Sequence, residues 1–276
     1  MIPRPSPSEV SGSAALTPSQ QRAVEHVDGP VLVLAGPGSG KTRVITRRIA
    51  HLVSIGIPAW QIMALTFTNK AASEMRRRVD SLIPADAPGR RGLVVSTFHS
   101  FASMLLRHHP EETGLRPGFV IHDTSDQRDT MKRVIADLGV GGRWTPASAL
   151  AQVSRLKNAL RSPADAAGDG DFRGRSVARL YEAYQAELAR SNAVDFDDLL
   201  YMTARLLRSK EALRRAYSER FRYLLIDEYQ DTNHAQLVIA RAIAEHGNIM
   251  VVGDPDQSIY GWRGADLRNI LEFEEA

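Results

Sequence analysis

A glycine-rich stretch near the N-terminus has the residue types and spacing of a phosphate-binding loop. The stretch 35–42, Ala-Gly-Pro-Gly-Ser-Gly-Lys-Thr, follows an apolar run at 31–34 and precedes a helical pattern. Glycines let backbone N–H groups converge on phosphate oxygens, and a helix start adds a positive dipole end. A solvated turn is the alternative, which the flanking strand and helix patterns disfavour. The predicted phosphate ligands are Gly36, Gly38, Ser39, Gly40 and Lys41, and Thr42 is a predicted Mg²⁺ ligand.

Two acids follow a second apolar run and complete the chemistry that this loop requires. Asp227 and Glu228 come directly after residues 223–226. Asp227 is suited to hold Mg²⁺ with Thr42, and Glu228 is then placed to orient and polarise an attacking water. Gln257 follows the next apolar run, 249–252, where its amide can sense a γ-phosphate by hydrogen bonding. These residues predict a site that binds and hydrolyses a nucleoside triphosphate.

Aromatic side chains beside polar residues suggest a second ligand, a single-stranded nucleic acid. Phe67 follows the apolar run 62–66, and Tyr260, Trp262 and Arg263 form a cluster flanked by glycines. Aromatic faces that stack on bases contribute about 1–3 kcal/mol per base. A core position for Phe67 and a buried Trp262 are the alternatives.

The elements that must position these residues alternate between short apolar runs and amphipathic segments, which is typical of an α/β fold with a parallel sheet. Strands are expected at 31–34, 62–66, 93–96, 223–226 and 249–252. Thr17 is a suitable N-cap for a first helix within 16–24. Gln20 on that helix carries a carboxamide that suits the N6/N7 edge of adenine, with a solvated helical glutamine as the alternative.

Residues 110–192 have a different character, since helical patterns dominate and strand-like runs are few. We expect a mostly helical subdomain inserted into the α/β sheet, with loops at 139–142 and 161–170. Asp195 is the expected N-cap of the helix that follows the insertion. The basic residues of the insertion favour either a solvated face or a polyanion surface. They are Arg128, Lys132, Arg133, Arg143, Arg155, Lys157 and Arg161.

Composition sets wider limits on the class of protein. The chain has 276 residues, 43% hydrophobic, and a formal net charge of +3, which only weakly favours a polyanion partner. It has no cysteine, so disulfides and cysteine-based zinc sites are excluded and a reducing, cytoplasmic location is expected. No stretch reads as a membrane span, and residues 1–14 read as a disordered leader.

The motifs occur in an order that resembles UvrD/PcrA/Rep-type superfamily 1 DNA helicases. The resemblance begins at Leu16-Thr17-Pro18-Ser19-Gln20, similar to the Q motif, and continues through the phosphate-binding loop as motif I. The later matches are 66–72 to motif Ia, 96–100 to the next DNA-contacting motif, 195–200 to a further signature, 226–233 to motif II and 252–265 to motif III. A P-loop kinase or transport ATPase does not account for motifs Ia and III together.

The resemblance implies a fold and a division of labour. It implies a RecA-like P-loop NTPase core built from 15–110 and 193–276, with 111–192 as a helical accessory subdomain that can meet duplex. It implies ATP-driven 3′-to-5′ movement on single-stranded DNA, with the pathway served left open. The implied adenine contacts are Gln20 and Arg43, and the implied catalytic residues are Lys41, Glu228 and Gln257. The implied DNA contacts are Phe67, Asn69, His99, Tyr260, Trp262 and Arg263.

Two departures from the family pattern shape the expected activity. Thr17 stands where the family usually has Asn, and the chain ends at Ala276, just past motif III. The second RecA-like domain, with the arginine that completes the ATP site, is therefore expected to be absent or supplied by a partner. Such an arginine is worth about 10³–10⁵ in rate. We expect weak binding of ATP, Mg²⁺ and single-stranded DNA with little unwinding. The alternative is a non-catalytic ATP- and DNA-binding module that needs a partner domain.

Overall fold

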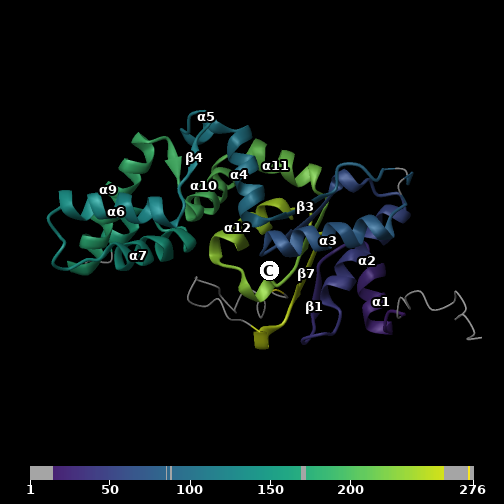
Figure 1. The fold of residues 1–276 in the computed structure, drawn as a ribbon. Helices are drawn as coiled ribbons and strands as arrows, with labels where there is room; N and C mark the ends of the chain where they lie inside the picture. The colour runs from purple at the N-terminus through teal and green to yellow at the C-terminus, as the bar shows by residue number, and fades with distance from the viewer. Residues whose placement is uncertain (1–14, 85, 88, 169–171, 258–272, 274–276) are drawn as a thin grey trace, which may run out of the picture.

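The computed structural model describes residues 15–84, 86–87, 89–168, 172–257 and 273. Within them a five-stranded parallel sheet has the order β1-β7-β6-β2-β3 (Figure 1). The strands are β1 (Val31–Leu34), β2 (Ile62–Thr66), β3 (Val94–Thr97), β6 (Tyr223–Ile226) and β7 (Ile249–Gly253). This confirms the predicted α/β fold with a parallel central sheet flanked by helices. The expected leader at 1–14 lies outside the described residues.

The strand register brings the predicted chemistry to one edge of the sheet. Leu34 pairs with Gly253, Leu65 with Ile226 and Thr66 with Thr97, so neighbouring strands end together. Ligands of open parallel sheets bind beyond the carboxyl ends of the strands. The segments that leave this edge are the phosphate-binding loop after β1, the acids after β6 and the polar loops after β2, β3 and β7.

Alternate residues of each strand enter two different hydrophobic layers, as the two-residue period of a strand requires. One layer contains Ile62 and Ala64, the other Met63 and Leu65. The first is covered by α1 (Pro18–Glu25), α2 (Lys41–Ser54) and α3 (Asn69–Leu82). The second is covered by α4 (Phe98–His108), α10 (Phe196–Ser209) and α12 (His234–Ile243), with α11 (Glu211–Arg220) alongside. Both faces are buried, so the strand sequences are continuously apolar.

The segment between β3 and β6 carries a third hydrophobic cluster of its own. Its helices are α6 (Thr124–Asp137), α7 (Pro146–Asn158), α8 (Pro163–Ala167) and α9 (Phe172–Arg190), and they lie to one side of the sheet in Figure 1. A short parallel pair, β4 (Val120–Ile121) and β5 (Ala193–Val194), stands where the chain enters and leaves this cluster. Before it, α5 (Pro110–Thr113) follows α4, and Phe119 packs into the cluster that covers the sheet.

Local capping chemistry explains where several helices begin. Thr17 caps α1 in a capping box with Gln20, and Asp195 caps α10 in a capping box with Asp198, as expected from the sequence. The expected loop at 161–170 was wrong in part, because α8 forms there. Ser162 and Asp165 make a capping box, and Pro163 occupies the first helical turn. Among the described helices, none combines the length and apolar character needed to cross a membrane.

Candidate nucleotide site and nucleic-acid groove

The phosphate-binding loop leaves the start of α2 open to a ligand. Gly40 is the N-cap of α2 and, lacking a side chain, makes no cap hydrogen bond. Its φ of +88° lies in the left-handed region, and a Cβ there would stand 3.3 Å from the Gln20 Nε2 atom. The first N–H groups of α2 therefore lack an intrahelical partner, which is the arrangement that binds phosphate at helix N-termini.

Lys41 is nearly buried and its ammonium has no hydrogen-bond partner among the described residues. Its side chain is 10% exposed, and Nζ lies 3.7 Å from Asp254 Oδ2 and 3.8 Å from Glu228 Oε2. Both distances exceed hydrogen-bond length, so three N–H donors remain unsatisfied. Phosphate oxygens at the adjacent loop fit this ammonium, because they would supply both charge and acceptors.

Thr42 and Asp227 meet across 185 residues of sequence, and Thr42 Oγ1 donates to Asp227 Oδ2 at 3.3 Å. Burial, and then the charge of Glu228, raise the pKa of Asp227 to about 6. A hydroxyl beside a carboxylate is a donor set of hard oxygens, which fits Mg²⁺ when nucleotide phosphates complete the shell. No group of three or more His, Cys, Asp or Glu able to hold a metal occurs in the described part of the chain.

Glu228 has a strained backbone that several contacts hold in place. Its φ of +51° is in the left-handed region, which costs a non-glycine residue about 1–3 kcal/mol. Its N–H donates to Asp227 Oδ1 at 3.0 Å, and its carbonyl accepts from the Asp231 N–H at 3.0 Å. The side chain, 40% exposed, accepts from Gln230 Nε2 at 2.9 Å. Its carboxylate thus faces the site and is partly open to solvent.

The proposed adenine contact, Gln20, already makes two contacts within the protein. Its Oε1 accepts from Thr17 N at 2.9 Å, and its Nε2 donates to Ser39 O at 2.8 Å. Each atom keeps one further hydrogen-bonding position, so contact with adenine stays a prediction. Arg43 is half-buried on the first turn of α2, next to Gly40.

Asp254 is a site residue that the sequence reasoning did not single out. It lies 3% exposed directly after β7, faces Lys41, and accepts a hydrogen bond from Gln257 Nε2. The signal available in the sequence was its position, an acid at the end of an apolar run, which is the same signal that identified Asp227.

A groove of about 940 Å³ opens between the core and the helical insertion. It brings together three of the predicted DNA contacts, Phe67, Asn69 and His99. Phe67 is half-buried and packs edge-on against Phe98, with 6.5 Å between ring centroids. It therefore has partial core packing, as one expectation had it, and an exposed part that a base could stack on, as the other had it. The other predicted contacts, Tyr260, Trp262 and Arg263, lie outside the described residues. The remaining polar lining comes largely from residues after β3, from α7 and α10, and from the segment after β6.

Phe196 is a groove residue whose role the sequence reasoning missed. It is 48% exposed at the start of α10 and meets the His99 ring edge-on, with centroids 6.3 Å apart. The sequence contained a signal in the aromatic that follows the Asp195 cap, which was interpreted only as part of an amphipathic helix.

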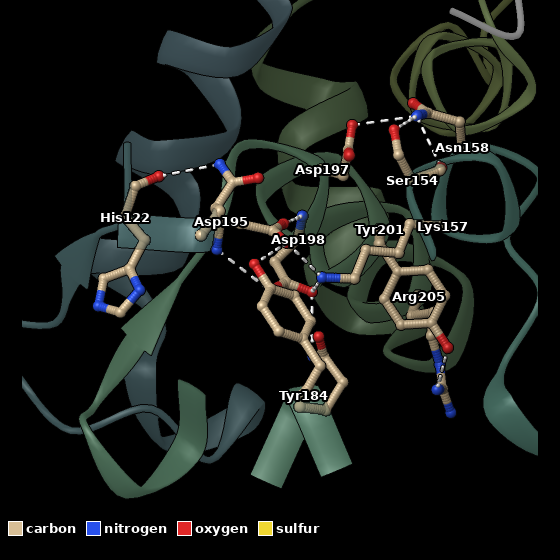
Figure 2. A network of polar contacts seen from close by, with 12 residues as sticks. His122, Ser154, Lys157, Asn158, Tyr184, Asp195, Asp197, Asp198, Tyr201 and Arg205 are labelled. Carbon is tan, nitrogen blue, oxygen red and sulfur yellow. Dashed lines mark hydrogen bonds and ion pairs between the residues drawn. The ribbon is translucent and has the colours of Figure 1, made fainter. Parts of the chain in front are cut away.

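A buried ionic network joins the insertion to the core, as Figure 2 shows. Lys157 Nζ on α7 lies 2.7 Å from Asp195 Oδ2 and 2.8 Å from Asp198 Oδ1, and Tyr184 OH donates to Asp195 at 3.1 Å. Burial alone would lower the pKa of Lys157, but the two carboxylates raise it above its usual value. Lys157 is fully buried, so its expected place in a solvated or polyanion-binding face was wrong.

Asn158, the residue after Lys157, connects α7 to the segment that follows Asp227 and Glu228. Asn158 Nδ2 donates to Asp197 Oδ1 at 3.0 Å, and Asn233 Nδ2 donates to Asn158 Oδ1 at 2.5 Å. Asn233 caps α12, which begins shortly after Glu228. Hydrogen bonds therefore link α7 both to the start of α10 and to the segment that follows the two acids.

A parallel sheet with a phosphate-binding loop after β1 and paired acids after β6 defines a P-loop nucleotide-binding domain. A family model, the UvrD/REP helicase N-terminal domain, matches residues 16–276, and the chain belongs to this family. It is 49% identical over 261 residues to the ATP-dependent DNA helicase PcrA of Leuconostoc citreum, covering 93% of this chain and 34% of the relative.

Two staphylococcal relatives give the same result. Identity is 43% to the PcrA helicase of Staphylococcus epidermidis and 42% to that of Staphylococcus aureus, each over 260 residues. Each comparison covers 93% of this chain and 35% of the relative. The chain thus spans about a third of the length of the curated relatives it matches.

Proposed function

We propose that this chain is the ATP-binding part of a DNA helicase, in which Mg²⁺·ATP hydrolysis is coupled to binding of single-stranded DNA. The observation that carries the proposal is the buried ammonium of Lys41. It faces the open phosphate-binding loop, has no hydrogen-bond partner among the described residues, and lies beside the Thr42–Asp227 pair. The names of the relatives support the same chemistry, since each is an ATP-dependent DNA helicase.

In this proposal each residue of the nucleotide site has one task. Gln20 and Arg43 contact adenine, and Gly36, Gly38, Ser39, Gly40 and Lys41 hold the phosphates. Thr42 and Asp227 would hold Mg²⁺, which supplies charge neutralisation at the phosphates when bound. Glu228 orients the attacking water and accepts its proton, and Gln257 contacts the γ-phosphate. Hydrolysis is then mostly positioning and charge stabilisation by groups already in place.

The groove between core and insertion is the proposed path of the DNA strand. Phe67, Asn69 and His99 line it, and Tyr260, Trp262 and Arg263 are proposed to extend the same surface. We assign the core to 15–110 and 193–276 and the accessory subdomain to 111–192, which is proposed to meet single/double-strand junctions. Movement from 3′ to 5′ and a cytoplasmic location belong to this proposal.

A second domain is proposed to complete the motor, in the same polypeptide or from a partner. The supporting observation is that the relatives are about three times as long as the matched region. On its own, this chain is proposed to hydrolyse ATP weakly and to unwind little. The alternative is a non-catalytic module that binds ATP and DNA for a partner. It differs from the first proposal only in that this chain would not hydrolyse ATP.

ATP binding and hydrolysis, with and without single-stranded DNA, test the proposal in Lys41→Ala and Glu228→Gln. Matched controls are Lys210→Ala and Glu219→Gln, which make the same changes at exposed positions outside the site. We expect Lys41→Ala to weaken ATP binding at least tenfold and Glu228→Gln to keep binding but lose turnover. Binding without turnover in the unmodified chain favours the module. If Lys41→Ala keeps both ATP binding and turnover, the result contradicts both the helicase proposal and the non-catalytic module.

A further inference from the structure

A single buried carboxamide connects the acid that orients water to the loop that follows the neighbouring strand. Gln230 is 1% exposed. Its Nε2 donates to Glu228 Oε2 at 2.9 Å, and its Oε1 accepts from the Asp254 N–H at 2.9 Å. The side chain donates hydrogen at one end and accepts it at the other, which a carboxamide can do because it carries an NH₂ group and a carbonyl oxygen.

Both ends of this bridge lie at groups that face the nucleotide. Glu228 has the left-handed backbone described above, so its carboxylate depends on neighbouring contacts for its position. Asp254 lies 3.7 Å from Lys41 Nζ and accepts from Gln257, the proposed γ-phosphate contact. Strands β6 and β7 are adjacent and parallel, with Ile226 opposite Val251, so both exit loops leave the same edge of the sheet.

We propose that Gln230 is a positioning residue that fixes Glu228 and the Asp254–Gln257 turn relative to each other. A shift of the turn on contact with a γ-phosphate is then passed to the water-orienting carboxylate through one side chain. This inference rests on the proposed function for its effect on hydrolysis, while the bridge itself does not.

Two substitutions separate the two halves of the bridge. Gln230→Glu keeps an acceptor for the Asp254 N–H but sets oxygen against oxygen at Glu228, whereas Gln230→Leu removes both bonds. Gln185→Leu is the matched control, because Gln185 Nε2 also donates to a buried carboxylate, Asp198, at 3.1 Å, but on α9 of the insertion. The full 276-residue chain is used for all variants.

The kinetic test compares kcat with KM for ATP in the presence of single-stranded DNA. Both Gln230 variants are expected to lose about 10- to 100-fold in kcat, because small displacements of a catalytic group have effects of that size. KM and the Kd for Mg²⁺·ATP stay within threefold, and Gln185→Leu stays within twofold in kcat. A kcat within twofold of the unmodified chain in both Gln230 variants overturns the positioning role.

Two further measurements test whether the Gln230 bridge exists, and neither requires ATP hydrolysis. A chain that does not hydrolyse ATP would count against the proposed function but not against the bridge. Amide exchange at Asp254 is expected to accelerate at least tenfold in Gln230→Leu and to stay protected in Gln230→Glu. The exchanged pair Glu228→Gln with Gln230→Glu restores a donor and an acceptor, so its unfolding midpoint should recover from that of Gln230→Glu. Unchanged exchange, or no recovery, overturns the bridge.

Discussion

At the scale of single residues, the nucleotide site is built from charges whose partners are incomplete. Among the described residues, Lys41 has carboxylates nearby but no hydrogen-bond partner. Asp227 is buried and accepts hydrogen bonds from the Thr42 hydroxyl and the Glu228 N–H. Such arrangements reduce the stability of the protein without its ligand, and they are the ones in which a bound ligand gains most.

Asp227→Asn should make the chain without Mg²⁺ or nucleotide more stable at pH 7.5, by about 1–2 kcal/mol. The reason is that the pKa of Asp227 is raised to about 6, so its ionised form is disfavoured in the folded state. As the pH falls below 6 the folded protein protonates this carboxyl and the penalty disappears. The difference between variant and parent should therefore shrink between pH 6 and pH 4. Urea unfolding at several pH values measures it, and a variant less stable than its parent at pH 7.5 contradicts the assignment.

His246 should make stability fall as the pH is lowered. Its Nε2 lies 2.8 Å from Phe221 O, and its Nδ1 accepts from the Asn248 N–H at 3.0 Å, which requires a neutral ring. Burial lowers the pKa of His246 below its usual value. The contribution is thus present above about pH 6.5, the usual histidine pKa, and is lost as the unfolded chain takes up a proton below it.

The variant His246→Phe removes this titration and keeps an aromatic ring. Its free energy of unfolding should decline less steeply than that of the parent between pH 7 and pH 5. Parallel curves over that interval would show that His246 takes up its proton equally in the folded and the unfolded chain, which contradicts the lowered pKa.

At the scale of elements, short-range chemistry sets the helix starts and long-range contacts set how the helices are held. The phosphate-binding turn and the α7–α10 junction illustrate the two cases. The turn depends on the backbone conformation of Gly40, and the junction depends on a buried ion pair between residues 38 positions apart.

Gly40→Ala should weaken ATP binding, and Gly247→Ala should not. Both glycines have φ near +85°, at +88° and +83°, so each alanine costs about 1–2 kcal/mol in the left-handed region. Only at Gly40 would the new Cβ approach another side chain, 3.3 Å from Gln20 Nε2. Thermal unfolding measures the shared cost, and ATP titration measures the specific one. Equal ATP affinity in the two variants would contradict a role for the Gly40 turn and its close approach to Gln20 in ATP binding.

Lys157→Ala should destabilise the chain by about 3–5 kcal/mol, because it leaves Asp195 and Asp198 buried without their cation. Arg155→Ala on the same helix is the control, since Arg155 is exposed and should change stability by less than about 0.5 kcal/mol. Urea unfolding of both variants measures the difference. Similar values for the two would show that the buried pair does not hold the insertion.

At the scale of the whole molecule, the groove exists only because the insertion lies beside the edge of the sheet where the strands end. Residues from β2, β3, α7 and α10 line one continuous surface that no single segment forms alone. Its aromatic side chains are suited to bases and its one lining arginine, Arg155, to a phosphate.

Phe196→Ala should weaken binding of single-stranded DNA by about 1–3 kcal/mol, with an unchanged dependence on salt concentration, because a stacking surface is lost. Arg155→Ala should instead reduce the salt dependence by about one phosphate contact. Phe172→Ala is the control, as Phe172 is a still more exposed aromatic that does not line the groove. Fluorescence titration with single-stranded DNA at several salt concentrations distinguishes the three variants. If Phe172→Ala loses as much DNA affinity as Phe196→Ala, the DNA does not bind specifically in the groove.

The amino-acid sequence by itself predicted the strands, the phosphate-binding loop and the order of the motifs. These features depend on neighbours within a few residues: apolar runs for buried strands, glycines for the loop, and Thr17 and Asp195 for helix starts. The two acids could be assigned because their place after a strand is itself a local pattern. The same local rules, applied to a segment rich in small and polar residues, missed the short helix α8.

Only the tertiary structure decided which of these residues meet. It places Thr42 against Asp227 across 185 positions, Lys41 between Glu228 and Asp254, and Lys157 inside a buried ionic network rather than on a basic face. The physical reason is that burial and partner charge, which fix whether a lysine is solvated, paired or available to a ligand, arise from chain segments brought together by packing. A local pattern of residue types does not contain that information.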